Sequence, residues 1–165
     1  MNPIEQFGQW IREANTIAVL TGAGMSTESG IPDFRSENGI YAQEERVEYY
    51  LSEHYYQKNP VDFWRRFKRM FSLKLMGDFA PNAGHRFLRW LEDIGKTVVI
   101  LTQNIDGLHT KAGNTNVIEL HGTLQTATCP SCGKTYDLAF VNRTDVPCCG
   151  ECGTILKPDV VLFGG

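Results

Sequence analysis

Four of the five cysteines fall into two Cys-x-x-Cys pairs, and no other feature of this sequence constrains its fold as strongly. Cys129 pairs with Cys132, Cys149 pairs with Cys152, and sixteen residues separate the two pairs. Two such turns can present four thiolates to one tetrahedral zinc ion, and four sulfur ligands leave no position for water or substrate. We therefore predict a small zinc-ribbon module with one structural zinc ion. Cys148 is interpreted as a bystander, because as a ligand it would leave three residues instead of two before Cys152.

Outside the cysteine pairs, short apolar runs alternate with amphipathic stretches. We expect buried strands at residues 16–21, 97–102, 116–120 and 158–163, helices at residues 3–14, 60–75 and 81–91, and an irregular segment at residues 37–59. Strands that alternate with helices are typical of a parallel sheet with helices on its faces. The fold class predicted is therefore α/β, a Rossmann-like doubly wound parallel sheet with the zinc-ribbon module added.

The expected domain organisation follows from the order of these segments. Residues 1–120 and 154–165 are assigned to the Rossmann-like domain, residues 121–153 to the zinc-binding module, and residues 37–80 to a helical or flexible insertion that belongs to the smaller domain.

Charge and hydropathy argue against two classes of partner. The net charge is −3 and the pI about 5.8, so the chain has no basic footprint for nucleic acid. No apolar run approaches the roughly 20 residues that a membrane span needs. The first residues lack the basic start and apolar stretch of a signal peptide, and clustered cysteines fit a reducing compartment. We therefore expect a cytoplasmic protein that binds neither nucleic acid nor membrane.

Polar residues follow three of the expected strands. Gly22-Ala23-Gly24 follows the first strand, Gln103, Asn104 and Asp106 follow the second, and His121 follows the third. Because ligands of open α/β sheets bind outside the carboxyl ends of the strands, these residues are expected to line one crevice. The two glycines would let the backbone approach a pyrophosphate.

The glycine loop differs from the common phosphate-binding motifs. Thr27 stands where the dinucleotide fingerprint has its third glycine, and no Gly-Lys-Ser/Thr follows, which argues against a dehydrogenase and a nucleoside triphosphatase. Ser26 and Thr27 could cap a short helix or donate hydrogen bonds to a pyrophosphate. The adjacent segment 33–35 supplies a carboxylate, an aromatic lid and a cation. Such a loop suits a dinucleotide whose glycosidic bond is broken.

These motifs together resemble the sirtuins, the NAD-dependent protein deacylases. The matching stretches are "GAGMSTESGIPDFRS", "TQNIDGLH", "ELHG", "CPSC", "CGEC" and "KPDVVLFGG", in the order of the family. The resemblance implies NAD as co-substrate, a structural zinc ion, and removal of acetyl or other acyl groups from protein lysines. It also implies an acylated-lysine protein or peptide as partner; the oligomeric state stays open.

The resemblance assigns roles to individual residues. It implies that His121, as the base, and Asn104 are catalytic. The implied NAD-binding set is Gly22, Ala23, Gly24, Thr27, Asp33, Phe34, Arg35, Gln103, Asn104, Ile105, Asp106 and His121. The implied substrate strand contains Val160, Val161, Phe163 and Gly164, and the zinc ligands are Cys129, Cys132, Cys149 and Cys152.

The implied reaction uses these residue types in a consistent way. Nicotinamide leaves the ribose, the acyl-lysine oxygen attacks the ribose carbon, and His121 removes a proton from a ribose hydroxyl. Histidine suits this role because it is largely neutral yet basic at physiological pH. The products would be nicotinamide, O-acyl-ADP-ribose and free lysine. Phe67 and Met70 stand where relatives that prefer acidic acyl groups carry tyrosine and arginine, so apolar acyl groups are favoured.

Two alternatives remain beside deacylation. An NAD glycohydrolase or ADP-ribosyltransferase on the same fold would consume NAD without an acylated peptide, although the four cysteines argue against it. The family continues beyond "VVLFGG" with segments that hold the adenosine half of NAD, so we expect a truncated chain or one that a partner completes. A non-catalytic zinc-ribbon fragment is therefore the second alternative.

Overall fold

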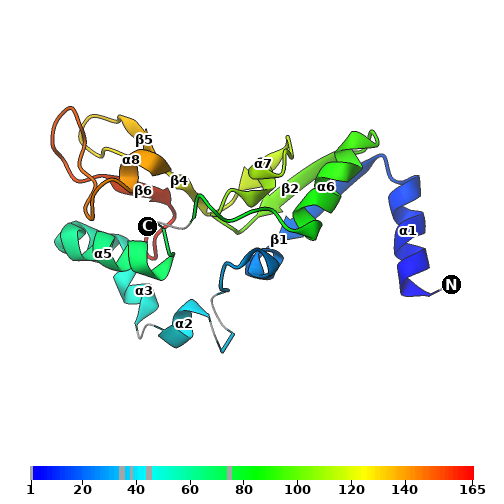
Figure 1. Cartoon of the computed structure of the whole chain (residues 1–165), viewed down its shortest axis with the longest axis horizontal. Helices are drawn as coiled ribbons and strands as arrows, with labels where there is room; N and C mark the ends of the chain where they lie inside the picture. The colour runs from blue at the N-terminus through cyan, green and yellow to red at the C-terminus, as the bar shows by residue number, and fades with distance from the viewer. Residues whose placement is uncertain (1, 34–35, 38, 44–45, 74–75) are drawn as a thin grey trace.

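The computed structural model describes residues 2–33, 36–37, 39–43, 46–73 and 76–165, without the side chains of residues 41 and 43. Two lobes lie side by side along the long axis of the molecule (Figure 1). One lobe contains a parallel sheet with helices, and the other contains an antiparallel sheet with the remaining helices. No helix among the described residues is both long enough and apolar enough to cross a lipid bilayer.

The parallel sheet has three strands in the order β1-β2-β3. Strand β1 spans Thr16–Thr21, β2 spans Thr97–Thr102 and β3 spans Val117–Glu119, close to the expected bounds. Thr21 lies opposite Thr102 in the register, so β1 and β2 end at the same level. Helix α6 (Ala83–Asp93) packs on β2, and its leucines form a small core with Val98 and Ile100. This sheet confirms the expected parallel α/β architecture.

The antiparallel sheet has the order β5-β4-β6. Its strands are β4 (Gly122–Thr128), β5 (Thr135–Asp137) and β6 (Lys157–Val160). The strand predicted at residues 158–163 does not belong to the parallel sheet, so that prediction was wrong. Strand β6 pairs with β4 instead, because Pro158 lies opposite the buried Ala127 in the core of the second lobe. Residues 154–165 therefore lie with the cysteine-bearing segment.

The helices are short except for three. Helix α1 spans Pro3–Glu13 and α5 spans Pro60–Met70, so α5 ends five residues before the expected end at residue 75. The others are α2 (Ile40–Gln43), α3 (Val47–Tyr50), α4 (Glu53–Lys58), α7 (Leu108–Lys111) and α8 (Leu138–Val141), with 3₁₀ turns at Ala23–Met25 and Thr27–Ser29.

The segment at residues 37–59 is more regular than expected. Three helices of four to six residues occupy its described part. Ser52 caps α4 by accepting a hydrogen bond from the Tyr55 amide, and Tyr55 and Tyr56 are buried. Helices this short are stabilised mainly by tertiary packing. The hydrophobic periodicity of the sequence therefore did not predict them.

One apolar core joins the helices of the second lobe to its sheet. Phe63, Trp64 and Phe67 of α5 are almost completely buried against Leu156 and Tyr136 of the cysteine-bearing segment. The indole Nε1 of Trp64 donates a hydrogen bond of 2.7 Å to the Leu156 carbonyl. The aromatic helix and the zinc-binding segment thus share a single core, although they are far apart in sequence.

A buried lysine adds a polar connection across this core. The Nζ of Lys68 donates hydrogen bonds to the carbonyls of Val141 and Thr144, at the end of α8. Lys68→Met keeps the aliphatic stem but leaves two carbonyls without this donor, and should lower the free energy of unfolding by about 1–3 kcal/mol. Urea denaturation of the whole chain measures this loss. Lys58→Met, at an exposed position, is the matched control and should change little. Equal effects of the two substitutions would contradict the role given to Lys68.

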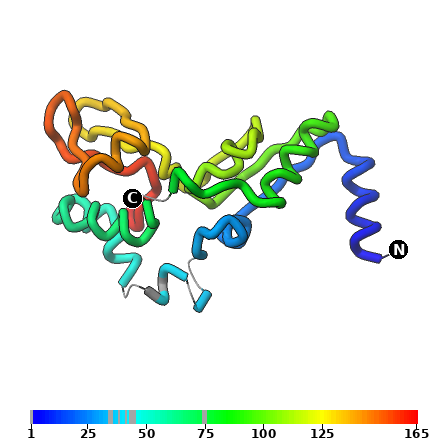
Figure 2. The backbone as a smooth tube through the Cα atoms, in the orientation of Figure 1, coloured from blue at the N-terminus to red at the C-terminus, as the bar shows by residue number. Residues whose placement is uncertain are grey.

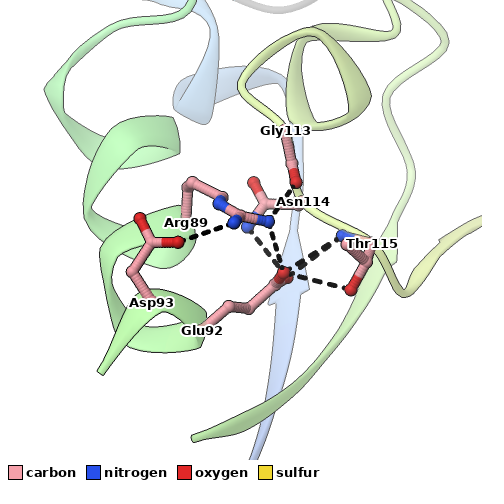
Figure 3. Close-up of polar contacts among 6 residues, drawn as sticks. All are labelled: Arg89, Glu92, Asp93, Gly113, Asn114 and Thr115. Atoms are coloured by element: carbon pink, nitrogen blue, oxygen red, sulfur yellow. Dashed lines mark hydrogen bonds and ion pairs between the residues drawn. The ribbon is translucent and has the colours of Figure 1, made fainter. Parts of the chain in front are cut away.

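A network of ion pairs and hydrogen bonds stabilises the first lobe near the beginning of β3 (Figure 3). Arg89 donates to the Gly113 carbonyl at 2.6 Å and pairs with Asp93 at 2.6 Å. The Glu92 carboxylate accepts hydrogen bonds from the amide and hydroxyl of Thr115. This network fixes α6 to the turn that leads into β3.

The backbone trace shows where the chain passes between the lobes (Figure 2). One crossing leads from the second lobe into α6, and another leads from β3 into β4 (Figure 1). The Nζ of Lys111 donates hydrogen bonds to the carbonyls of Gly77 (2.8 Å) and Phe79 (2.6 Å) in the first crossing. The Leu124 amide donates to the Ile105 carbonyl at 2.8 Å beside the second.

Candidate functional site

The site begins where β1 and β2 end. The hydroxyl of Thr21 donates to the hydroxyl of Thr102 at 2.8 Å, and the Asn104 amide donates to the same Thr102 oxygen at 3.0 Å. Because the strands are parallel and in register, the loops that follow them leave the sheet at one edge. The structure thus brings the glycine loop and the Gln103–Asp106 segment together, as the sequence predicted.

The glycine loop forms two 3₁₀ turns rather than the expected short capped helix. The side-chain amide of Asn104 donates to the Gly22 carbonyl at 2.9 Å, which holds the start of the loop. Among the described residues, the amides of Ala23 and Gly24 make no backbone hydrogen bond, as is usual for the first N–H groups of a helical turn. These free donors suit a phosphate oxygen.

Two hydroxyls of the loop are used differently from what was expected. Ser26 is buried and donates to the Asp106 carboxylate at 2.6 Å, and Thr27 donates to the Gly24 carbonyl at 3.0 Å. The other carboxylate oxygen of Asp106 accepts from the Leu108 amide at 2.9 Å. Ser26 neither caps a helix nor points a free hydroxyl at a ligand, because Asp106 provides a stronger, charged acceptor.

His121 lies between β3 and β4 and is exposed. Its Nδ1 is 3.0 Å from the Gln103 carbonyl oxygen. A carbonyl only accepts hydrogen bonds, so Nδ1 carries a proton in this contact. Orientation of one imidazole nitrogen by a backbone carbonyl is the arrangement that a general base needs.

Other predicted NAD-site residues are only partly described. The Asp33 carboxylate accepts a hydrogen bond from the Ser36 amide at 3.1 Å. Ile105 packs against the core of the second lobe, with its carbonyl bonded to β4. Phe34 and Arg35, proposed as an aromatic lid and a cation, lie outside the described residues.

The expected substrate strand continues beyond β6, and its backbone pairs with two other segments. The Val161 amide donates to the His121 carbonyl at 2.9 Å, and the Phe163 amide donates to the Leu51 carbonyl at 3.0 Å. The side chains of Val161 and Phe163 are exposed, whereas Leu162 is buried. One edge of this segment is therefore already paired with the protein. The exposed end at Gly164 adopts a positive φ of 75°.

Two buried histidines near the strand ends were missed by sequence reasoning. His109 on α7 is 2.9 Å from the Thr21 hydroxyl, and His85 at the start of α6 packs against His109. Burial lowers the pKa of His109 to about 4 and also lowers the pKa of His85. The sequence does place His109 near the predicted site, because it follows Asp106 by three residues.

The four cysteine sulfur atoms meet at the edge of the second lobe. All four lie within 4.8 Å of one another, with Cys129 to Cys152 and Cys132 to Cys149 both at 3.5 Å. A zinc–sulfur bond of about 2.3 Å in tetrahedral geometry requires sulfur atoms roughly 3.8 Å apart. The four residues predicted as ligands therefore fit one zinc ion, and Cys148 does not belong to the group.

A tyrosine supports this cluster from the core side. The Tyr136 hydroxyl accepts from the Gly150 amide at 2.8 Å and lies 3.1 Å from the Cys149 sulfur. Donation from this hydroxyl to the sulfur is the main reason that the pKa of Cys149 is lowered to about 6. A thiol that deprotonates easily is prepared for metal binding, since the thiolate is the ligand.

The chain is similar to known proteins in sequence and in fold. The Sir2 family profile matches residues 22–165. The NAD-dependent protein deacetylase 2 of Geobacillus kaustophilus is 82% identical over 165 residues, which is all of this chain and 67% of that protein. Among solved structures, an ADP-ribose complex of a mutant Sir2 homologue has a TM-score of 0.87 at 33% identity, covering 100% of this chain and 65% of that one. A complex described as Sir2, p53 peptide and NAD⁺ has a TM-score of 0.80 at 35% identity, covering 99% and 65%.

The fold and the site define an α/β protein in which the glycine loop and the Gln103–Asp106 segment meet at the strand ends, and in which four cysteines are grouped to hold one metal ion. The chain belongs to the Sir2 family. It spans about two thirds of the length of the relatives that it matches.

Proposed function

We propose that the protein removes acetyl or other apolar acyl groups from protein lysines, with NAD as co-substrate, and releases nicotinamide and O-acyl-ADP-ribose. The observation that carries this proposal is the orientation of His121. Its Nδ1–H donates to the Gln103 carbonyl, and the residue is exposed between β3 and β4. Membership of the Sir2 family supports NAD as the molecule that this edge receives.

Each residue of the proposed site has a separate role. The Ala23 and Gly24 amides bind the pyrophosphate, and Asn104 orders the loop and faces the ribose and nicotinamide. Bound NAD supplies a ribose carbon that becomes electrophilic as nicotinamide leaves. The Nε2 of His121 accepts the proton of a ribose hydroxyl. Asp106 accepts the hydrogen bond of Ser26, and we propose that it stabilises the glycine loop in this way rather than by contact with the ligand.

The substrate lysine is proposed to enter beside the segment from Val160 to Gly164. An extended peptide would pair with the edge of this segment that the protein does not use, and backbone pairing tolerates many sequences. Phe67 and Met70 pack with Val160 in one apolar core. None of these three side chains carries a charge that could bind an acidic acyl group. The core therefore favours acetyl and longer apolar groups. Clustered cysteines favour the reducing cytoplasm as its location.

Mass spectrometry of O-acetyl-ADP-ribose tests the proposal. The full 165-residue chain is incubated with NAD and an acetyl-lysine peptide, beside His121→Asn and an exposed-histidine control, His54→Asn. We expect product from the chain and from His54→Asn, and at least a roughly hundredfold loss in His121→Asn, because general-base catalysis contributes about 10²–10⁴-fold.

The alternatives give different products. ADP-ribose formed equally with and without the acetyl peptide would show an NAD glycohydrolase. Absence of every product, with zinc bound and the fold intact, would support the non-catalytic fragment. Product that is unchanged in His121→Asn would exclude the base assigned here.

A further inference from the structure

Two histidines from different helices meet in the interior behind the strand ends. His85 of α6 and His109 of α7 are 0% and 2% exposed. Their ring centroids are 4.8 Å apart and the rings are inclined by 61°. The Nε2 of His85 and the Nδ1 of His109 are buried without a hydrogen-bond partner among the described residues. An unpaired buried nitrogen is costly, so two at one contact call for an explanation.

The partners of His109 determine where its proton lies. The Thr21 hydroxyl donates its hydrogen to Thr102 Oγ1, so toward His109 it can only accept. The Nε2 of His109, at 2.9 Å, is therefore the donor and carries the proton. In neutral His109 the Nδ1 atom is therefore unprotonated and can only accept a hydrogen bond, and it is the atom without a partner.

The same reasoning applied to His85 gives the complementary result. The Asn82 amide donates to the Nδ1 of His85 at 3.2 Å, so this nitrogen is bare. Neutral His85 therefore carries its proton on Nε2, which is its unpartnered atom. His85 is thus left with an unused donor and His109 with an unused acceptor, on two rings whose centroids are 4.8 Å apart.

We propose that His85 and His109 are a pair of neutral positioning residues, each protonated on Nε2, in which the donor of His85 complements the acceptor of His109. The charges around the pair agree with this state. Asp106 favours protonation of both rings and Arg86 opposes protonation of His85, but burial outweighs these effects and lowers both pKa values.

The pair connects two parts of the site that are otherwise separate. Asn82, which bonds to His85, also donates to the Met25 carbonyl at 2.7 Å and to the Ser29 hydroxyl at 3.1 Å, and so holds the glycine loop. On the other side, His109 bonds through Thr21 to Thr102, which fixes the Asn104 amide. The inference rests on the proposed function in one respect, since these two parts are the walls of the proposed NAD site.

Nitrogen-15 NMR of the histidine rings tests the tautomers without any turnover. In the full zinc-loaded chain at pH 7, both His85 and His109 should be neutral with the proton on Nε2, whereas His121 should carry it on Nδ1. Single His→Gln variants assign the signals. Protonation on Nδ1 in either buried ring, or a positive charge on one, would overturn the proposal even if the chain deacylates lysine.

A double-mutant cycle tests whether the two rings act together. His85→Asn keeps an acceptor near the place of Nδ1 and removes the Nε2 donor, while His109→Gln keeps a donor near Nε2 and removes the Nδ1 acceptor. Because the two rings pack against each other, each single change disturbs the environment of the other ring, so the second change should cost about tenfold less in the unfolding equilibrium constant than the first. Strict additivity would contradict coupling, and the NMR result stands if a variant does not fold. Loss of product in the deacylation assay with correct tautomers would refute the function alone.

Discussion

Removal of zinc is expected to unfold the entire second lobe and not only the cysteine turns. Cys129 and Cys149 are buried in the same core as Trp64 and Leu156. Structural zinc sites contribute about 10–16 kcal/mol in small peptides, which is comparable to the roughly 5–15 kcal/mol that stabilises a whole domain. Without zinc, the four cysteines therefore no longer stabilise the turns against which α5 packs.

The three tryptophans make this result easy to measure. Trp64 is 1% exposed, whereas Trp10 and Trp90 are 60% and 49% exposed. In a Trp10→Phe, Trp90→Phe chain only Trp64 emits, and its emission should shift to the red as a chelator removes one equivalent of zinc. Cys148→Ser should keep zinc and blue emission, and Cys149→Ser should lose both. Complete zinc release with unchanged Trp64 emission would show that the core does not depend on the ion.

Substitution of Gly122 by alanine is expected to be the most damaging single change near the site. Gly122 has φ +78°, and a Cβ there would lie 2.1 Å from the Asp159 carbonyl oxygen. The backbone of β6 would have to move away from β4, and His121 would move with it. We expect a loss of about 3–5 kcal/mol of unfolding free energy, from a left-handed conformation and a backbone clash together.

Gly95→Ala is the matched control for that experiment. Gly95 has a similar φ of +89°, but nothing lies within 4 Å of the place of its Cβ. It should lose only about 1–2 kcal/mol, the cost of a left-handed alanine. Urea denaturation of both variants separates the clash from the strain. Equal losses at the two positions would mean that β4 and β6 are not held as closely as described.

Much of the first lobe could be predicted because its signals are local. The bounds of β1 and β2 were predicted without error, since each is a continuous apolar run followed by polar residues. The predicted burial of β1 was wrong, because its residues are exposed or half-buried up to Thr21 and Leu20 is 68% exposed. The metal cluster was equally accessible, because the spacing of Cys129, Cys132, Cys149 and Cys152 carries its own geometry.

The parts that failed depend on contacts between distant segments. Strand β6 reads like another strand of the parallel sheet, and only its packing against β4 places it elsewhere. Ser26 reads like a cap or a phosphate donor until Asp106, eighty residues later, is seen to accept its hydrogen bond. The individual roles of His85 and His109 depend on which neighbour donates, and that direction has no sequence signature.

The core that the aromatic helix shares with the zinc-binding segment also has a consequence for biosynthesis. Trp64 and its hydrogen-bond partner Leu156 are 92 residues apart. At about 5–20 residues per second, the ribosome needs about 5–18 s to make that stretch. During this interval Phe63, Trp64 and Phe67 have been made but their partners have not. The nascent chain therefore exposes an aromatic surface that the finished fold buries, and exposed apolar surface of this kind makes a folding chain prone to aggregation.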